Sequence, residues 1–408
     1  MHYLCFANSY DINNSTGSGR MNDMINSILD KGHQITLITS SYDYLTGKTV
    51  PNFKGLLCSI EKHESLRIIR GRCYSGYNKS KMSRILTFTS FLFSSIYSLR
   101  YVKKCDKIFV GTPPFFLGFP GLIAKYFNRA ELIYEVRDLW VDVAIELGYL
   151  KSKFLIKIVK KTENIFLNKS SKIITNSPAF KSYIINYGVN EEKIFFIPNG
   201  VDLKMFFPIP KNKNLLKDLE LKNKFIVIYT GAHGEANNLE YVLESAKIIA
   251  SKTNIVIIFI GDGNRKNYLK NQAIELKLNN VLFIDPVPKN ELINYLSIAD
   301  VGLATLKPTN FLKTTYPNKV FDYMACKLPC IIGIDGVIRD LVESNKAGVF
   351  ADPKNPESLA KEIIFMSTLD KESIGKMGES GYNVIRKSFN RNVSTQQLAK
   401  HLGCFNYE

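Results

Sequence analysis

Residues 225–263 of this 408-residue chain read FIVIYTGAHGEANNLEYVLESAKIIASKTNIVIIFIGDG. Two apolar runs in this stretch, Phe225–Tyr229 and Ile255–Ile260, have the length and the Ile and Val content of buried strands. The segment Asn238–Ala250 between them has the length of a helix, and a glycine-containing turn follows each run. This order of strand, helix and strand predicts a parallel βαβ unit.

The same alternation of short apolar runs and amphipathic stretches extends through the rest of the chain. In the first half, strands are expected at Tyr3–Ala7, Gln34–Thr39, Leu66–Arg70, Lys107–Val110, Glu131–Glu135, Lys172–Thr175 and Ile194–Ile197. In the second half, further strands are expected at Val281–Ile284, Val301–Ala304, Cys330–Gly333 and Gly348–Phe350. A helix from about Ser18 to Lys31 is expected to end at Gly32, since glycine suits the position after a helix.

The pattern changes near residue 200, where an Asn199-Gly200 turn pair is followed by prolines and a polar run. We therefore predict an α/β chain with two Rossmann-like, doubly wound domains that face a central cleft. The first domain spans 1–205, the linker 206–222 and the second domain 223–378. The final residues, 379–408, are expected to form a helix that packs back on the first domain.

The composition is that of a globular protein, with 45% hydrophobic and 22% charged residues and a net charge of +17. Seven cysteines without a CxxC pair indicate free thiols in a reducing compartment, and no metal site is expected. The chain starts directly with a strand rather than a signal peptide. The longest uncharged apolar stretch, Ile85–Leu99, is shorter than the roughly 20 residues of a spanning helix. A cytoplasmic protein that touches a membrane without crossing it is expected.

Three glycine-rich loops follow predicted strands and precede predicted helices. They contain Gly17, Gly19 and Arg20; Gly231 and His233; and Gly261 and Gly263. Glycine lets backbone amides approach a ligand, and a helix N-terminus favours an anion. Neither the first nor the third loop completes the GxGxxG fingerprint, so each is equally well an ordinary turn. A lone loop histidine such as His233 is likewise more often a packing residue than a ligand.

The segment Tyr316–Pro329, YPNKVFDYMACKLP, is the most informative in the chain. Asn318 is expected to cap a helix, with Lys319 and Asp322 on one exposed turn. A lysine there can meet phosphate, and a carboxylate can hold two ribose hydroxyls. The alternative is a solvated ion pair between the two side chains.

Taken together, these motifs resemble those of a known family. Asn199-Gly200-Val201-Asp202 with Phe207-Pro208 is similar to the connector of retaining GT-B glycosyltransferases of family four. Other matching segments are the Gly-Ser-Gly loop at 17–19, Lys31–His33, Thr175–Ser177, Gly261–Gly263, Ala299–Val301 and Pro317–Ala325. The resemblance covers nearly the whole chain in the right order. The segment Glu135–Trp140, EVRDLW, further resembles the N-acetyl-L-fucosaminyltransferases of O-antigen and capsule synthesis.

The resemblance implies a hexosyl or N-acetylhexosaminyl transferase that acts with retention at the anomeric carbon and requires no metal or other cofactor. The residues expected to bind the donor are Gly17, Gly19, Arg20, Gly231, His233, Arg265, Asn318, Lys319 and Asp322. Among these, Lys319 and Arg265 are assigned to the diphosphate and Asp322 to the ribose. Asp138 is assigned to the acceptor hydroxyl, with Arg137 binding acceptor phosphate or fixing Asp138, and Lys319 completes the catalytic set.

Two departures from the family pattern concern the donor site. The family commonly has a Glu-x7-Glu pair, of which the second Glu binds ribose, but this chain has Thr314 and Asp322 at those positions. The phosphate-binding Arg and Lys expected after the first strand of the second domain are absent from Gly231–Asn238. Lys319, Arg265 or Arg20 is expected to supply the missing charge.

A membrane face is expected on the first domain, over 72–105. From Ser65 to Cys105 there are nine Lys or Arg and no acidic residue, and Ile85, Phe88, Leu92, Ile96 and Leu99 recur at helical spacing. Such a helix suits an anionic lipid interface, although a core helix of the first domain is the alternative. The segment Lys151–Lys172, with seven lysines and one Glu, extends the basic surface. No nucleic-acid-binding motif accompanies the charge.

The sequence therefore predicts transfer of a sugar, such as N-acetyl-L-fucosamine, from a UDP-sugar to a saccharide on a polyprenyl diphosphate. The expected place is the inner face of the cell membrane, in O-antigen or capsular polysaccharide synthesis. A UDP-sugar epimerase of the same fold and a degenerate binding subunit remain as alternatives.

Overall fold

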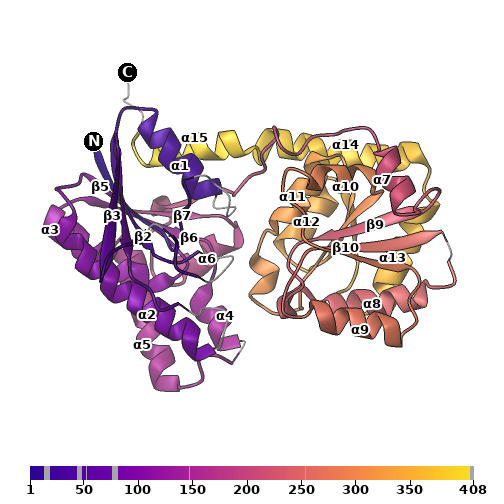
Figure 1. The fold of residues 1–408 in the computed structure, drawn as a ribbon, viewed down its shortest axis with the longest axis horizontal. Helices are drawn as coiled ribbons and strands as arrows, with labels where there is room; N and C mark the ends of the chain where they lie inside the picture. Colours follow the sequence, from indigo (N-terminus) through magenta and orange to yellow (C-terminus); the bar gives the residue numbers. More distant parts are fainter. Residues whose placement is uncertain are drawn as a thin grey trace. The chain divides into compact units, whose positions relative to one another are not determined.

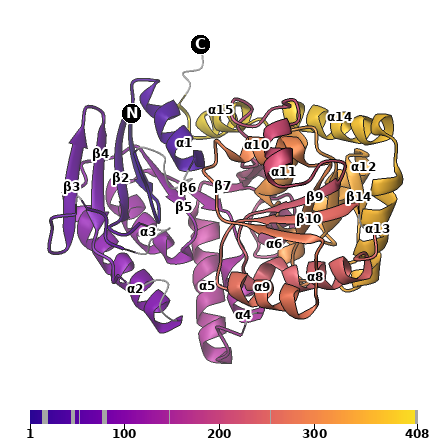
Figure 2. The ribbon, with the colours of Figure 1, turned by 45° about the vertical axis from the view of Figure 1, so that its right-hand side comes forward.

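The computed structural model describes residues 1–12, 19–43, 48–51, 53–75, 81–146, 148–252 and 254–404. Contacts divide the chain into two compact units, one formed by Met1–Pro198 with Ser394–Glu408 and the other by Asn199–Val393 (Figures 1 and 2). Each unit is built around its own mainly or wholly parallel sheet. The expected α/β fold with two parallel-sheet domains is confirmed.

The sheet of the first unit has the strand order β3-β4-β2-β1-β5-β6-β7-β8. Its strands are β1 (His2–Phe6), β2 (Gln34–Ser40), β3 (Cys58–His63), β4 (Leu66–Gly71), β5 (Lys107–Gly111), β6 (Glu131–Val136), β7 (Lys172–Thr175) and β8 (Ile194–Phe196). All neighbouring strands run parallel except β3, which pairs antiparallel with β4. The sequence analysis missed β3, because its residues CSIEKH are polar and only partly buried at the sheet edge.

The helices of the first unit are α1 (Gly19–Leu29), α2 (Lys81–Ser98), α3 (Gly118–Asn128), α4 (Trp140–Glu146), α5 (Lys153–Lys169) and α6 (Ala179–Ile185). Helix α3 contacts both α2 and α5, so these three helices form one layer. Helix α1 ends as expected, with Gly32 at a φ of 74° just beyond it.

The sheet of the second unit has the order β11-β10-β9-β12-β13-β14 and is parallel throughout. Its strands are β9 (Phe225–Thr230), β10 (Ile255–Ile260), β11 (Val281–Ile284), β12 (Val301–Thr305), β13 (Cys330–Gly333) and β14 (Gly348–Phe350). Its helices are α7 (Lys213–Asp218), α8 (Leu239–Ile248), α9 (Lys266–Glu275), α10 (Leu292–Ile298), α11 (Asn318–Ala325), α12 (Val337–Ser344), α13 (Pro356–Thr368) and α14 (Lys371–Ser388).

Strand β9 shows why the second sheet is covered on both faces. Its residues alternate between two apolar clusters: Ile226 and Ile228 pack in one, Val227 and Tyr229 in the other. Each cluster is completed by helices, α11 on one side and α8 on the other. A central strand buried on both faces is typical of a doubly wound sheet.

The unit boundaries differ from the ranges expected from the sequence. Residues 199–222 lie within the second unit, where Val201 and Phe206 are buried in its core. The C-terminal stretch forms two helices rather than one, α14 and α15 (Arg391–His401). Helix α14 packs on α11, while the residues from Ser394 onward join the first unit. There, Tyr3 donates a hydrogen bond from its hydroxyl to the Leu402 carbonyl over 3.2 Å.

Candidate functional site

The carboxyl ends of β9 and β10 carry two glycine-containing loops that pack backbone against backbone. Gly231 donates its N–H to the Ile260 carbonyl over 2.9 Å, and His233 donates to the Asp262 carbonyl over 2.8 Å. A Cβ at Gly261, which has a φ of 144°, would lie 1.9 Å from the Gly231 carbonyl oxygen. The glycines therefore allow two loops to share one thin layer at the edge where open parallel sheets bind ligands.

Lys319, in the first turn of α11, places its ammonium group against this layer. Its Nζ lies 3.6 Å from the centroid of the Tyr229 ring, and a Cβ at Gly231 would lie 3.3 Å from Nζ. The Nζ atom is buried although the residue is partly exposed, and it has no hydrogen-bond partner among the described residues. Burial lowers its pKa to about 7. A buried, unpartnered cation beside backbone amides is suited to receive an anion.

The interpretation of Lys319 and Asp322 as a solvated ion pair is wrong. No salt bridge joins these two described residues, because the Lys319 ammonium lies over the Tyr229 ring. Burial raises the pKa of Asp322 to about 6, and the nearby positive charges of Lys289 and Arg391 act in the opposite direction. Within the described ranges, the carboxylate of Asp322 accepts no hydrogen bond, so its oxygens are available to hydroxyl groups.

Asn318 is the first residue of α11 rather than its cap. Pro317 occupies the cap position, with a φ of −66° and a ψ of 121°, and no side chain caps the helix. The exposed Asn318 side chain instead accepts a hydrogen bond from Asn199 Nδ2 over 3.1 Å. This hydrogen bond joins the start of α11 to the NGVD segment at 199–202. The two stretches are far apart in the sequence and meet only in the folded structure.

His233 lies beneath the loop layer, fully buried among aromatic rings. Its ring centroid is 6.1 Å from those of Tyr229, Phe259 and Phe283. Burial, with a smaller contribution from Lys266, lowers its pKa to about 4, so the imidazole is neutral near pH 7. Both ring nitrogens lack a hydrogen-bond partner among the described residues. The donor-binding role assigned to His233 stays a prediction.

Arg265 is already engaged by neighbouring side chains. Its guanidinium group pairs with Glu240, with 3.1 Å between Nε and Oε1, and stacks 3.9 Å from the centroid of the Tyr268 ring. The next residue, Lys266, donates to the Gly261 carbonyl and to Asp285, each over 2.7 Å. Arg265 and Lys266 are thus engaged by protein groups, whereas the Lys319 ammonium has no hydrogen-bond partner among the described residues.

In the first unit, the residues assigned to the donor and the acceptor meet at Glu135, at the end of β6. The fully buried Glu135 accepts hydrogen bonds from Arg20 Nε and Arg137 Nε, each over 2.7 Å. Arg20 also donates to the carbonyls of Pro198, over 2.6 Å, and Ile197, over 3.0 Å. Burial raises the pKa of Glu135, but Arg137 and Arg20 outweigh it and hold the pKa below its usual value. The donors of Arg20 are thus used inside the protein.

The structure says less about the other predicted site residues of the first unit. Asp138 is exposed, and Arg137 pairs with Glu135 instead of Asp138, so a buried Arg137–Asp138 pair is not formed. Gly19 is buried as the first residue of α1, and Gly17 lies outside the described residues. The binding and catalytic roles assigned to all these residues stay predictions.

Sequence reasoning missed two residues that organise these sites. Tyr229 supplies the ring under the Lys319 ammonium, and Glu135 holds two arginines. The signal for Tyr229 was its place two residues before Gly231, and for Glu135 a carboxylate within an otherwise apolar strand. Across the described residues, no group of three or more His, Cys, Asp or Glu side chains is arranged to hold a metal ion.

Comparison with known proteins agrees with this architecture. The model for glycosyl transferases group 1 matches residues 211–384, and the model for glycosyltransferase family 4 matches residues 20–205. The putative colanic acid biosynthesis glycosyl transferase WcaI of Escherichia coli is 26% identical over 78% of this chain and 80% of its own length. The probable glycosyltransferase WbjE of Pseudomonas aeruginosa is 21% identical over 79% and 82%.

Solved structures share the fold over nearly the full chain. Sucrose-phosphate synthase from Thermosynechococcus elongatus superimposes with a TM-score of 0.74 at 16% identity, covering 98% of both chains. HepE from Anabaena, solved in complex with UDP-glucose, gives 0.71 at 18% identity, covering 99% of this chain and 100% of HepE. With both halves matched in order and two parallel-sheet units, the chain belongs to the family 4 glycosyltransferases of the GT-B fold.

Proposed function

We propose that the chain transfers a sugar from a UDP-sugar to a saccharide carried on a polyprenyl diphosphate, with retention at the anomeric carbon. The single observation that carries the donor half is the buried Lys319 ammonium, which lies beside the Gly231 loop without a hydrogen-bond partner among the described residues. The donor diphosphate supplies the missing anion. The UDP-glucose complex of Anabaena HepE supports a uridine nucleotide.

Two residues of α11 bind different parts of the UDP-sugar. The Lys319 ammonium stabilises the charge of the diphosphate as it leaves, and charge stabilisation of this kind is a large part of catalysis in such reactions. Asp322 accepts hydrogen bonds from the ribose hydroxyls. The sugar is N-acetylated, as in N-acetyl-L-fucosamine, and the reaction needs no metal.

The acceptor half rests on the first unit. Asp138, exposed next to Arg137, orients or deprotonates the acceptor hydroxyl, and Arg137 keeps its outer guanidinium nitrogens for an acceptor phosphate. One relative supports such an acceptor: UDP-Gal:alpha-D-GlcNAc-diphosphoundecaprenol alpha-1,3-galactosyltransferase of Escherichia coli. It is 28% identical over 58% of this chain and 61% of its own length. For this acceptor class we propose a reaction of O-antigen or capsular polysaccharide synthesis at the inner membrane face.

Helix α2 supports membrane association because its polarity is reversed. Its buried positions include Ser83, Thr87, Phe91, Ser94, Ser95 and Ser98. Its exposed positions include Met82, Ile85, Leu86 and Phe93, of which Phe93 is 66% exposed. A helix that packs hydroxyl groups inward and turns large apolar side chains outward suits a lipid interface better than water.

Helix α5 adds a second apolar and basic surface in the same helix layer. Phe154, Leu155 and Ile158 are exposed near its start, and Lys151, Lys153 and Lys157 surround them. Each basic residue near an anionic membrane contributes about 1 kcal/mol. No helix in the described parts of the chain combines the length and the apolar character that crossing a bilayer requires.

Vesicle sedimentation tests the membrane surface. The full chain is expected to sediment with phosphatidylglycerol vesicles and not with phosphatidylcholine vesicles, and to dissociate as salt rises. The variant Ile85→Glu with Phe154→Glu is expected to lose sedimentation, whereas Phe365→Glu, at an exposed aromatic residue of the second unit, retains it. Equal sedimentation of both variants would exclude this surface.

A transfer assay tests the function itself. The purified chain is incubated with a panel of UDP-sugars and polyprenyl diphosphate saccharides, and the product linkage is read by NMR. Transfer with an unchanged anomeric configuration, lost in Lys319→Met, is the expected result. Release of an altered UDP-sugar would identify an epimerase instead, and donor binding without turnover would identify a binding subunit.

A further inference from the structure

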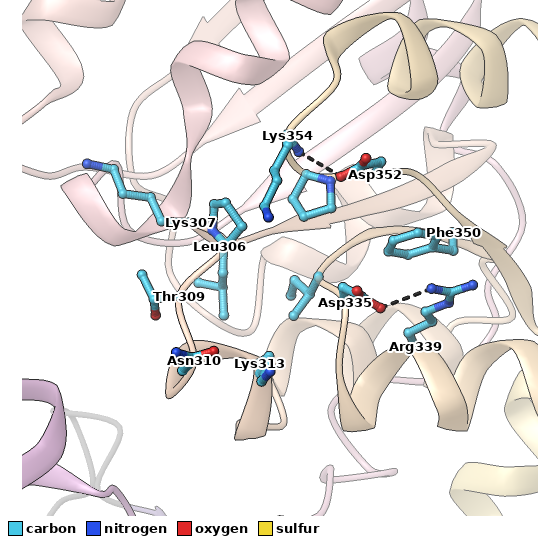
Figure 3. A pocket seen from close by; sticks show the side chains of 13 residues that line it. Leu306, Lys307, Thr309, Asn310, Lys313, Asp335, Arg339, Phe350, Asp352 and Lys354 are labelled. Atoms are coloured by element: carbon cyan, nitrogen blue, oxygen red, sulfur yellow. Dashed lines mark hydrogen bonds and ion pairs between the residues drawn. The ribbon is translucent and has the colours of Figure 1, made fainter. Parts of the chain in front are cut away.

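A second cavity opens in the second unit, at the carboxyl ends of β12, β13 and β14 (Figure 3). Its volume is about 410 Å³. The residues that line it come from the 306–313 segment, from Asp335 and Arg339, and from the 350–354 segment. Gly231, Lys319 and Asp322 are not among them.

Four cations and two carboxylates line the cavity, and Glu235 and Glu343 pair with two of the cations, so the groups in contact carry equal numbers of positive and negative charges. Of the four cations, Arg339 pairs with Asp335 over 2.9 Å and with Glu343 over 2.7 Å, and Lys307 pairs with Glu235 over 3.1 Å. Asp352 accepts the backbone N–H of Lys354 over 3.0 Å.

The ammonium groups of Lys313 and Lys354 make no ion pair or hydrogen bond to any described residue. In Figure 3 the Lys354 side chain extends toward the Leu306 and Lys307 side of the cavity.

The remaining walls are partly apolar. The Arg339 guanidinium group covers one face of the Phe350 ring, 3.8 Å from its centroid, and Pro308 and Pro353 add apolar surface. Thr309 and Asn310 place a hydroxyl and an amide at the rim. Carbohydrate sites combine apolar faces with a few polar groups in this way, and two lysines add a preference for an anionic substituent.

We propose that this cavity binds a sugar that carries a phosphate or carboxylate group, with Lys313 and Lys354 contacting the anion. Two sources have this chemistry: a free sugar phosphate and an anionic sugar unit of the donor. A cavity of this volume accommodates a monosaccharide with its substituent.

The walls of the cavity also connect it to Lys319. Gly336 abuts the 306–313 segment so closely that a Cβ there would lie 1.9 Å from the Lys313 carbonyl oxygen. This segment continues through Leu312–Thr314 directly into α11, which carries Lys319. The proposal for the cavity does not rest on the proposed donor role of Lys319.

Titration of the full chain, followed by NMR, tests the binding. Glucose 6-phosphate and glucuronic acid are expected to bind saturably, and uncharged glucose is not. In the double variant Lys313→Ala with Lys354→Ala, the affinity for both charged sugars falls about tenfold or more. The control Lys376→Ala, at an exposed lysine of α14, leaves it unchanged. Unchanged affinity in the double variant, or equal binding of glucose, would overturn the proposal.

The variant Lys319→Met separates the two sources and the two proposals. Glucose 6-phosphate binding that depends on Lys354 and not on Lys319 assigns the cavity to a free sugar phosphate. UDP-glucuronic acid binding that depends on both Lys354 and Lys319 assigns it to the donor sugar. If the double variant loses the binding of charged sugars but keeps its UDP-glucose affinity, the cavity proposal stands. If Lys319→Met also keeps its UDP-glucose affinity, only the proposed function of Lys319 is refuted.

Discussion

The two units bury charge at the ends of their sheet strands in opposite ways. In the first unit, Glu135 is shared by Arg20 and Arg137, and Arg20 is further satisfied by two carbonyls. In the second unit, the Lys319 ammonium rests on Tyr229 without a hydrogen-bond partner in the described part of the chain. The first arrangement compensates its desolvation within the fold. We propose that a bound anion compensates the second, so that one charge is structural and the other binds a ligand.

The largest effect is expected from breaking the compensated cluster. Glu135→Gln leaves two guanidinium groups near each other without a counter-charge, so the free energy of unfolding of the first unit should fall by about 3–5 kcal/mol. Urea denaturation followed by circular dichroism measures the loss. Glu372→Gln, which removes the exposed pair with Lys376, should have no measurable effect. A loss for Glu135→Gln as small as that of this control would contradict the structural role.

The next effect sharpens the role of the loop layer that receives the Lys319 ammonium. Gly261→Ala puts a Cβ 1.9 Å from the Gly231 carbonyl oxygen, which is backbone and cannot turn away. The variant should lose about 2–3 kcal/mol of stability and bind UDP-glucose more weakly.

Gly375→Ala is the matched control, because no atom lies within 4 Å of a Cβ there, in the exposed part of α14. It should stabilise the chain by about 0.5–1 kcal/mol. Calorimetric unfolding of both variants compares them, and equal stability would argue against a close loop contact.

Removing the uncompensated charge should act in the opposite direction from Glu135→Gln. Lys319→Met keeps the apolar stem over Tyr229, so the free energy of unfolding should rise by about 1–2 kcal/mol. The affinity for UDP-glucose should fall roughly tenfold, since one charge-assisted contact is lost. Chemical denaturation and isothermal titration calorimetry measure the two changes. A variant that is less stable but binds UDP-glucose normally would make the ammonium a structural group.

The smallest expected effect is the pH dependence of donor affinity. The pKa of Lys319 is lowered to about 7, so its charge, and the affinity for the donor diphosphate, is lost as pH rises above 7. The pKa of Asp322 is raised to about 6, so its carboxylate is lost as pH falls below 6. UDP-glucose affinity should therefore peak between about pH 6 and 7, with a few-fold decline on each side.

The free energy of unfolding should also depend on the titration of Lys319 and Asp322, because the folded state disfavours the charged form of each. The folded state disfavours charged Lys319, so this penalty is complete below pH 7 and is relieved as pH rises toward 10.5. It disfavours charged Asp322 too, and this penalty develops as pH rises from 3.8 to 6.

Lys319→Met should remove the alkaline decline of UDP-glucose affinity, and Asp322→Asn the acid decline. A flat profile in the unmodified chain would exclude both assignments.

Much of the secondary structure could be predicted from the sequence, because buried parallel strands are continuous apolar runs. The runs at 225–230 and 255–260 became β9 and β10 almost to the residue. The polar edge strand β3 could not be predicted, because its residues lack an apolar pattern and the strand is formed by its pairing with β4. The start of α11 also differed, because Pro317 rather than Asn318 takes the cap position.

The sequence by itself determined the order of strands and helices, the glycine turns and the family, since each follows from local patterns of apolar residues and turn residues. Only the tertiary structure decided which charges are used inside the fold and which are left for a ligand. Arg20 and Arg265 looked as suited to phosphate as Lys319, but Glu135 and Glu240 already hold them. The cost of burying a charge depends on neighbours that are distant in the chain, and these are fixed only when the sheets assemble.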